Sequence, residues 1–144
     1  MIEQDTIRLL RECDSGAQMG MDAICDVLDR VKSNSMKGLL NESQRHHEKI
    51  SNEIRHELDR FQDEGKSPSP MASAMSWMKT HAELAVDESD HTIADLMIDG
   101  CNMGVKSLSR YLNQYSAADE KSKDLAKQLI GMEEALAVDL RPYL

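Results

Sequence analysis

Aromatic side chains and turn-forming residues are scarce in this sequence. One Trp, one Phe and three Tyr make up 3% of its 144 residues, and there are three Pro and seven Gly. So little Pro and Gly argues against a fold with many tight turns. Methionine occurs ten times, and the apolar residues are mainly Leu, Ile, Ala and Met, which favour helices over strands. The composition predicts an all-α protein of one domain.

Basic residues are also in short supply. There are 17 Lys and Arg against 26 Asp and Glu, so the formal net charge is −9. Nucleic-acid phosphates and anionic membrane surfaces attract clustered Lys and Arg, and the charge balance therefore predicts neither partner. We expect a well-solvated acidic surface, and the alternative is a surface that recruits a cationic partner.

Long apolar runs are absent, and paired cysteines are too. No stretch approaches the ~20 apolar residues of a membrane span, and acidic residues interrupt the first 20 residues where a signal peptide would lie. Cys13, Cys25 and Cys101 show no CxxC spacing, which is typical of small buried thiols in a reducing compartment. The sequence predicts a cytoplasmic protein.

Apolar residues recur at helical spacing along four long segments of a single domain. Residues 33–35 break the first pattern, Ser69 before Pro70 predicts the start of a short helix, and Ser116 with Asp119 predicts the start of the last long helix. The predicted single domain covers residues 1–144, with helices at about 4–32, 36–63, 88–115 and 117–143 and a crossover at 64–88.

The spacing of these segments predicts how the helices are connected. Two short loops force the first helix against the second and the third against the fourth, in antiparallel pairs. The crossover is long enough to run the length of a bundle, and it contains the short helix MASAMSWM. The side chains expected to pack inward from that helix are Met71, Met75 and Met78 or Trp77.

The first and third helices repeat one another at an offset of 84 residues, as Gly16, Met19 and Gly20 match Gly100, Met103 and Gly104. The second and fourth helices repeat more weakly at an offset of 86. The chain is therefore interpreted as one helical hairpin written twice. Small residues at four-residue spacing allow helices to approach closely, so we predict that the four glycines pack helices together. Chance placement and a backbone position beside a ligand are the alternatives.

The segments GAQMGMDAI, MSWM, HTIADLMIDGCNMGV and LIGMEEALAVDL, in this order of elements, resemble the ferritin-like superfamily and in particular its small, largely uncharacterised bacterial members. The resemblance covers nearly the whole chain. It implies an antiparallel four-helix bundle with a long crossover, holding a short helix, between the second and third helices.

The resemblance also implies a ligand pattern for two irons, and this chain departs from it. Di-iron members carry a Glu on two helices and a Glu-x-x-His on each of the other two. Here the second helix has Gln44 three residues before His47, and the fourth has Glu133 three residues before Leu136. The first helix offers only Asp14, whose repeat partner Ile98 is apolar. The residues are too few for a di-iron site.

His47 and Glu133 are matched by the repeat, and both lie near the centre of an apolar helix face. Buried polar groups need partners, so we expect His47 and Glu133 to form a hydrogen-bonded pair inside the protein. Two alternatives stay open: a partly exposed or unpaired His47, or a mononuclear iron or manganese site. The buried polar candidates are His47, Glu133, Asp14 and Ser43, and the metal alternative uses Asp14, His47 and Glu133.

No catalytic motif is present: the sequence contains no G-x-S-x-G, P-loop or dinucleotide fingerprint. The sequence favours a non-catalytic protein without a cofactor. Its predicted function is that of a ferritin-like bundle that has lost its di-iron site and acts through a protein partner or by forming a homo-oligomer. The alternative is a metal-binding or redox protein with an unusual ligand set around His47 and Glu133. A third hypothesis is an adaptor whose acidic surface binds a cationic protein.

Overall fold

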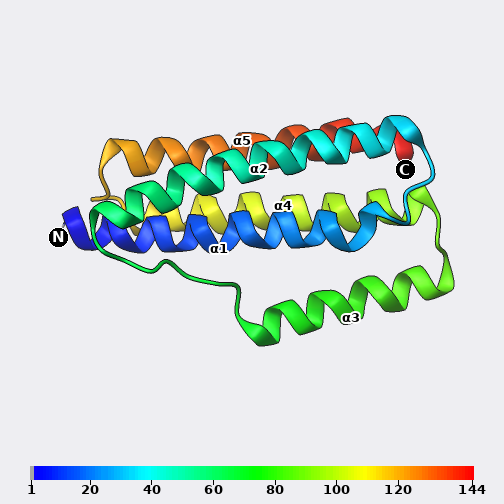
Figure 1. Cartoon of the computed structure of the whole chain (residues 1–144), viewed down its shortest axis with the longest axis horizontal. Coiled ribbons are helices and arrows are strands. Elements are labelled where there is room, and N and C mark those ends of the chain that lie inside the picture. Colours follow the sequence, from blue (N-terminus) through cyan, green and yellow to red (C-terminus); the bar gives the residue numbers. More distant parts are fainter. Residues whose placement is uncertain (1) are drawn as a thin grey trace.

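The structure is a computed structural model that describes residues 2–144, except for the side chains of residues 70–75, 77 and 78. Every regular element in this described part is helical, as the composition predicted (Figure 1). The elements are α1 (Ile2–Leu28), α2 (Asn34–Arg60), α3 (Pro70–Val86), α4 (Asp90–Gln114), α5 (Glu120–Leu140) and a closing 3₁₀ turn, η1 (Arg141–Tyr143).

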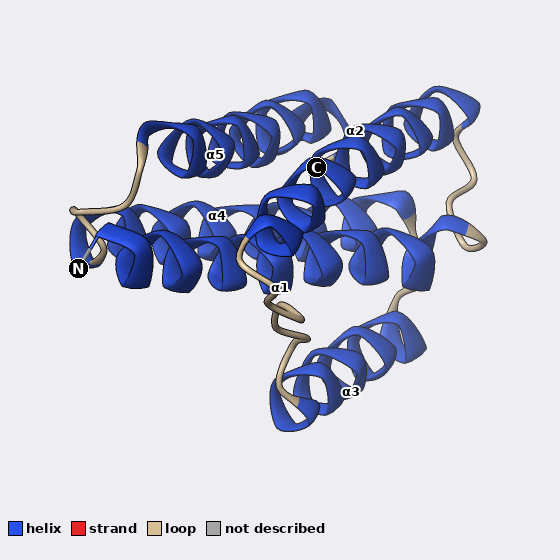
Figure 2. Cartoon of the chain, turned by 60° about the vertical axis from the view of Figure 1, so that its left-hand side comes forward, coloured by secondary structure: helices blue, strands red, loops and turns tan. Residues whose placement is uncertain are grey.

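Four of the helices are long and lie alongside one another. α1 contacts α2 and α4, and α5 contacts α2 and α4. α1 and α5 run in one direction, and α2 and α4 run in the opposite direction, so each of these contacting pairs is antiparallel (Figure 1). The chain between α2 and α4 returns from one end of the long helices to the other, and α3 within it lies outside them and contacts α4 (Figure 2).

The ends of α1 and α2 and the start of α5 differ from the sequence prediction, each for a local reason. α1 ends at Leu28 and not at residue 32, because the amide of Arg30 bonds the Val27 carbonyl oxygen in a tighter turn. α2 ends at Arg60 and not at residue 63, because Gln62 adopts a left-handed φ of 55°. α5 begins at Glu120 and not at residue 117, since the N-cap is Asp119, not Ser116.

α3 is longer than the short helix predicted for the crossover. It covers 17 residues, and its later part brings Leu84 into the core with 2% of its surface exposed. The helix therefore continues beyond MASAMSWM because one more apolar side chain is buried. The prediction that Met71, Met75 and Met78 or Trp77 pack inward falls on side chains outside the described part of the chain.

The core consists of two apolar clusters, and every long helix contributes to both. α1 passes from one cluster to the other between Ala17 and Ile24, and α4 does so between Cys101 and Leu108. α2 crosses between Leu40 and Ile50, and α5 between Leu129 and Leu136. The four segments that separate the clusters contain Gly20, Gly104, His47 and Glu133.

Burial follows the internal repeat. Leu9, Leu10, Cys13, Ala17 and Ile24 are buried in α1, and the five residues 84 positions later are buried in α4. Seven buried residues of α2, from Met36 to Ile54, likewise have partners 86 positions later that are buried in α5. The two helical hairpins, α1–α2 and α4–α5, thus bury largely equivalent positions. Thr6, Asp14 and Val27 are exceptions, because the residues 84 positions later are only partly buried.

Hydrogen bonds between the hairpins follow the repeat as well. The amide of Ser33 donates to Asp90 Oδ2 at 2.8 Å, and the amide of Asp119 donates to Thr6 Oγ1 at 2.8 Å. Asp90 stands 84 positions after Thr6, and Asp119 stands 86 after Ser33. Each hairpin therefore binds the turn of the other hairpin through an equivalent side chain.

None of the helices in the described part is long and apolar enough to cross a membrane.

Candidate functional site

A buried ion pair lies between the two apolar clusters. His47 Nε2 on α2 is 2.6 Å from Glu133 Oε1 on α5. His47 has none of its surface exposed, and Glu133 has 8%. His47 Nδ1 lies 2.8 Å from the carbonyl oxygen of Ser43, one helical turn earlier, and 3.4 Å from the Ser43 hydroxyl. The structure therefore brings together three of the four buried polar candidates: His47, Glu133 and Ser43.

The helix pattern explains why these polar side chains point inward. His47 lies three residues before Ile50 and seven after Leu40, both of which are buried. Glu133 stands in the same relation to Leu136 and to the buried Ala126 of α5. Residues at these spacings share one face of a helix. Burial of the two polar groups is tolerated because each is the hydrogen-bond partner of the other.

Gly20 and Gly104 leave room for this pair. A Cβ at Gly20 would lie 2.7 Å from His47 Nε2 and 3.3 Å from Glu133 Oε1. A Cβ at Gly104 would lie 3.7 Å from Glu133 Oε2, which is an ordinary contact. The glycine spacing predicted a close approach of another helix backbone. The nearest atom to a Cβ at Gly20 belongs instead to a polar side chain, His47.

The other two glycines have different surroundings. A Cβ at Gly16 would meet Leu108 and Leu129 at 3.8 Å, the distance of normal packing. At Gly100, the described part of the chain places no atom within 4 Å of a Cβ. The expected close approach of helices therefore does not account for Gly100, because the space beside it is open toward the described residues.

Burial disfavours charge on His47, but the hydrogen bond and the negative charge of Glu133 outweigh burial. Together with the Ser43 carbonyl, Glu133 raises the pKa of His47 above its ordinary value. The contact with Glu133 thus favours the imidazolium form of His47. The pair belongs to both hairpins, since His47 lies in the first and Glu133 in the second.

Cys101 on α4 lies beside the same carboxylate. Burial raises the pKa of its thiol, and the charge of Glu133 and a hydrogen bond to it raise it further. Cys13 is buried too, and burial raises its pKa to about 12. Cys25 is exposed, against the expectation of three buried thiols, because its position on α1 faces outward, where Gln44 Nε2 donates to its sulfur at 3.0 Å. The raised pKa values disfavour the reactive thiolate form of both buried cysteines.

Asp14 is buried with 1% of its surface exposed, but it belongs to a different contact. The amide of Lys66 donates to Asp14 Oδ2 at 3.0 Å, and Gln18 Nε2 donates to Oδ1 at 3.2 Å. Arg55 Nε lies 3.6 Å from Asp14 Oδ1. This carboxylate fixes the start of the crossover on α1 and is not brought to His47 and Glu133.

The crossover is held at this point by further side chains that the sequence analysis missed. Arg11 donates two hydrogen bonds to Asp63 Oδ2 and one to Oδ1, and Lys66 Nζ lies 2.6 Å from Glu12 Oε1. Gly65 adopts a φ of 83°, close beside Asp14. These partners are more than 50 residues apart in the sequence, so no local spacing could have indicated them.

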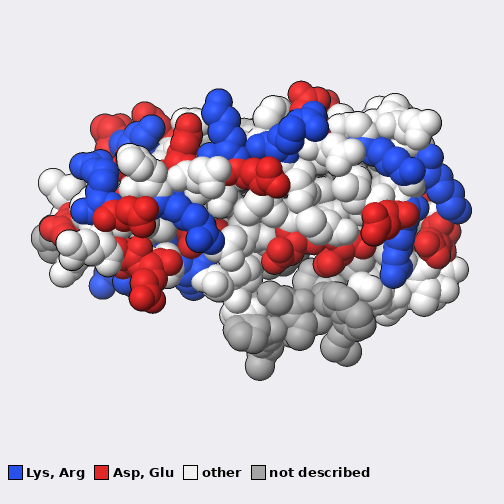
Figure 3. Space-filling model, viewed as in Figure 1, with Lys and Arg blue, Asp and Glu red and all other residues white. Residues whose placement is uncertain are grey.

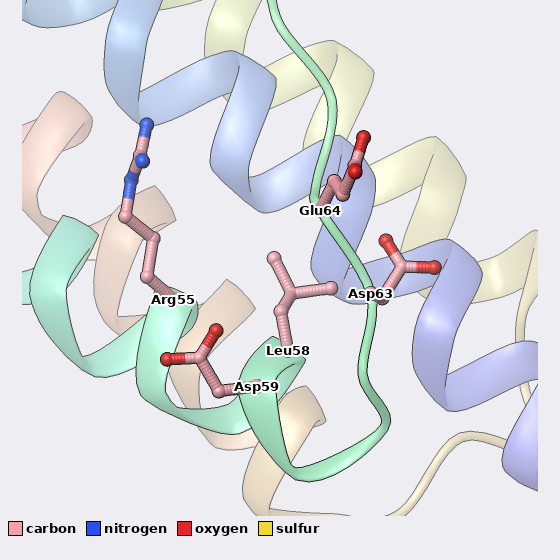
Figure 4. Close-up of a pocket in the computed structure, with 5 residues that line it drawn as sticks. All are labelled: Arg55, Leu58, Asp59, Asp63 and Glu64. Atoms are coloured by element: carbon pink, nitrogen blue, oxygen red, sulfur yellow. The ribbon is translucent and has the colours of Figure 1, made fainter.

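A surface hollow of about 190 Å³ adjoins this anchor (Figure 4). Its lining combines α2 with the chain that leaves α2: Arg55, Leu58, Asp59, Asp63 and Glu64. A second hollow, of about 420 Å³, lies between α1 and α2 and shares Arg55. Arg55 faces Asp14, and Asp63 is already paired with Arg11, so these charged groups serve the anchor of the crossover.

The metal alternative can be tested against these contacts. In the described part of the chain, no three His, Cys, Asp or Glu residues are grouped so that they could hold a metal ion. Asp14 is engaged by Lys66. Gln44, which stands where a Glu-x-x-His motif would have its Glu, donates to the outward-facing Cys25. The residues present therefore do not fit a di-iron centre or the proposed mononuclear site.

Comparisons of this chain with models of protein families, with curated proteins and with solved structures find no match.

Proposed function

We propose that this chain is a ferritin-like four-helix bundle without a di-iron centre, and that it acts by binding a protein, with a second copy of itself as the first candidate. The observation that carries this proposal is the layer between the two apolar clusters. Where metal ligands would have to project inward from four helices, His47 and Glu133 are bonded to each other, and α1 and α4 present Gly20 and Gly104. This layer joins the two hairpins, and its described residues offer no group of three ligands to a metal ion, so we assign the function to the surface of the protein.

The order and direction of the helices support the ferritin-like part of the proposal. Two antiparallel hairpins joined by one long crossover is the connection typical of ferritin-like folds, in contrast to an up-down-up-down bundle with short loops (Figure 1). The equivalent burial in the two hairpins agrees with this connection.

Exposed apolar side chains support action through the surface. Met19 on α1 has 40% of its surface exposed, and Met103 on α4, at the equivalent position of the second hairpin, has 69%. Methionine adapts its shape to different partners. Acidic and basic side chains are interspersed over the face shown in Figure 3. An apolar contact is therefore favoured over the adaptor hypothesis, in which a cationic partner binds through charge alone.

Element-specific analysis of natively purified protein tests the loss of the metal site. We expect iron and manganese well below one ion per chain, and unchanged helix content after treatment with a chelator. A stoichiometric metal would overturn the proposal. In that case His47→Ala, compared with a matched His46→Ala at an exposed neighbour, would show whether the alternative site around His47 and Glu133 binds it.

Sedimentation velocity over a range of concentrations tests self-association. We expect a dimer or higher oligomer that weakens in the double variant Met19→Ser/Met103→Ser. Val138→Ser is the matched control, since Val138 is 48% exposed on α5. A monomer at all concentrations would exclude the second copy as the partner.

A further inference from the structure

Both ring nitrogens of His47 face hydrogen-bond acceptors. Nδ1 lies 2.8 Å from the carbonyl oxygen of Ser43, and Nε2 lies 2.6 Å from Glu133 Oε1. A carbonyl oxygen only accepts, so Nδ1 must carry a hydrogen. Nε2 and the carboxylate cannot bond at this distance unless a second hydrogen lies between them. The pair therefore holds one dissociable proton, shared between the imidazole and the carboxylate.

The described groups around the pair supply no second positive charge. On α2, Ser43 presents a carbonyl and a hydroxyl. On α4, Cys101 presents a thiol, and on α1 and α4 the nearest positions are Gly20 and Gly104. Within the described residues, His47 is the single cationic group paired with Glu133. When the proton leaves, a buried carboxylate faces a neutral imidazole with no cation beside it in this part of the chain.

The pair also spans the boundary between the hairpins, since α2 belongs to the first and α5 to the second. Loss of its proton turns an attraction across this boundary into an uncompensated buried charge, which is strongly unfavourable. We propose that His47 and Glu133 form a proton-dependent latch that holds the two hairpins together when protonated and releases that contact in alkaline solution.

The direction of the effect follows from the raised pKa of His47. A group that binds its proton more tightly in the folded state stabilises the fold fully below its unfolded-state pKa of about 6.5. That contribution is lost as the pH rises through the folded-state pKa. Each unit by which the folded-state value exceeds the unfolded one corresponds to a tenfold change in the unfolding constant.

The experiment compares urea unfolding of the full chain between pH 5.5 and 9 with that of the double variant His47→Leu/Glu133→Met. Replacing a buried ion pair by apolar residues of similar size is often neutral for stability, and the four remaining histidines are shared by both proteins. We expect the unfolding constant of the natural chain to rise more across this range than that of the variant, by tenfold for each unit by which folding raises the pKa of His47. Equal pH dependence would overturn the latch.

A second measurement does not require the variant to fold. The imidazole ¹H and ¹³C signals of the natural chain are followed through the same pH range by NMR, with the exposed His46 as an internal reference. The latch requires His47 to titrate at a higher pH than His46. Titration of His47 at the same pH as His46, or below it, would overturn the proposal.

Discussion

The backbone amide of Ser33 donates to Asp90 Oδ2 at 2.8 Å, and the amide of Lys32 donates to the other oxygen of the same carboxylate at 2.8 Å. One side chain at the start of α4 thus satisfies two amides in the turn between α1 and α2. Thr6 makes the equivalent contact to Asp119 at the opposite end of the long helices. The ends of the two hairpins are fastened to each other by the same device.

Replacing Asp90 tests this fastening. We expect Asp90→Ala to lower the free energy of unfolding by about 2 kcal/mol, because two amides lose a charged acceptor. Thr6→Val should cost about 1 kcal/mol, since it removes one neutral hydrogen bond and keeps the shape of the side chain. Urea unfolding followed by circular dichroism measures both. Asp95→Ala, at an exposed position of α4, is the control, and an equal loss there would contradict the assignment.

Gly20 and Gly100 should respond in opposite directions to alanine. Gly20→Ala forces a Cβ to within 2.7 Å of His47 Nε2, so the ion pair has to shift, and we expect a loss of about 1–3 kcal/mol. Gly100→Ala meets no described atom and should stabilise α4 by up to about 1 kcal/mol, as alanine favours helix. Thermal unfolding of the two variants side by side measures the difference. A stabilised Gly20→Ala would show that the pair is not confined there.

The Arg11–Asp63 contact should make the protein sensitive to acid. The hydrogen bond from Arg11 lowers the pKa of Asp63, helped by the Gly65 amide. A carboxyl of this kind stabilises the fold above its unfolded-state pKa of about 4 and loses that contribution as the pH falls through its lower folded-state pKa. In Asp63→Asn we expect a weaker dependence of the unfolding midpoint on pH below about 4. Asp59→Asn, an exposed carboxyl at the same hollow, should keep the dependence of the natural chain.

The three thiols should differ in reactivity. Cys25 is exposed, and Cys13 and Cys101 are buried with raised pKa values. A water-soluble maleimide at neutral pH should modify the native chain once and the urea-unfolded chain at all three cysteines. Intact-mass spectrometry counts the adducts. Cys25→Ser should abolish the fast reaction, and rapid double labelling of the native chain would mean that one of the apolar clusters opens readily.

The long helices and the central pair were accessible to sequence reasoning because their signals are periodic. His47 lies on the apolar stripe of α2, and the repeat matches it to Glu133, so the sequence alone predicts this partner. The position of Asp14 could not be interpreted in this way. Its burial depends on the amide of Lys66, 52 residues away, and no local spacing indicates that contact.

Caps and helix ends were predicted less well for a related reason. Ser116 and Asp119 are both good N-cap residues, and the choice of Asp119 depends on its amide reaching Thr6 from another helix. The extent of α3 likewise depends on the burial of Leu84 in the core. Local sequence offered several boundaries in each case, and tertiary contacts selected one.

Residues 47 and 133 occupy matched positions but differ in chemistry, and this difference affects which hairpins can pair with each other. Because the hairpins bury matching positions, two copies of the first hairpin could in principle dock on each other in the same geometry, and so could two copies of the second. The first arrangement would set imidazole against imidazole, and the second would set carboxylate against carboxylate. Only the union of one hairpin of each kind gives a base facing an acid. This difference between the halves therefore favours the pairing of unlike hairpins over the pairing of like ones.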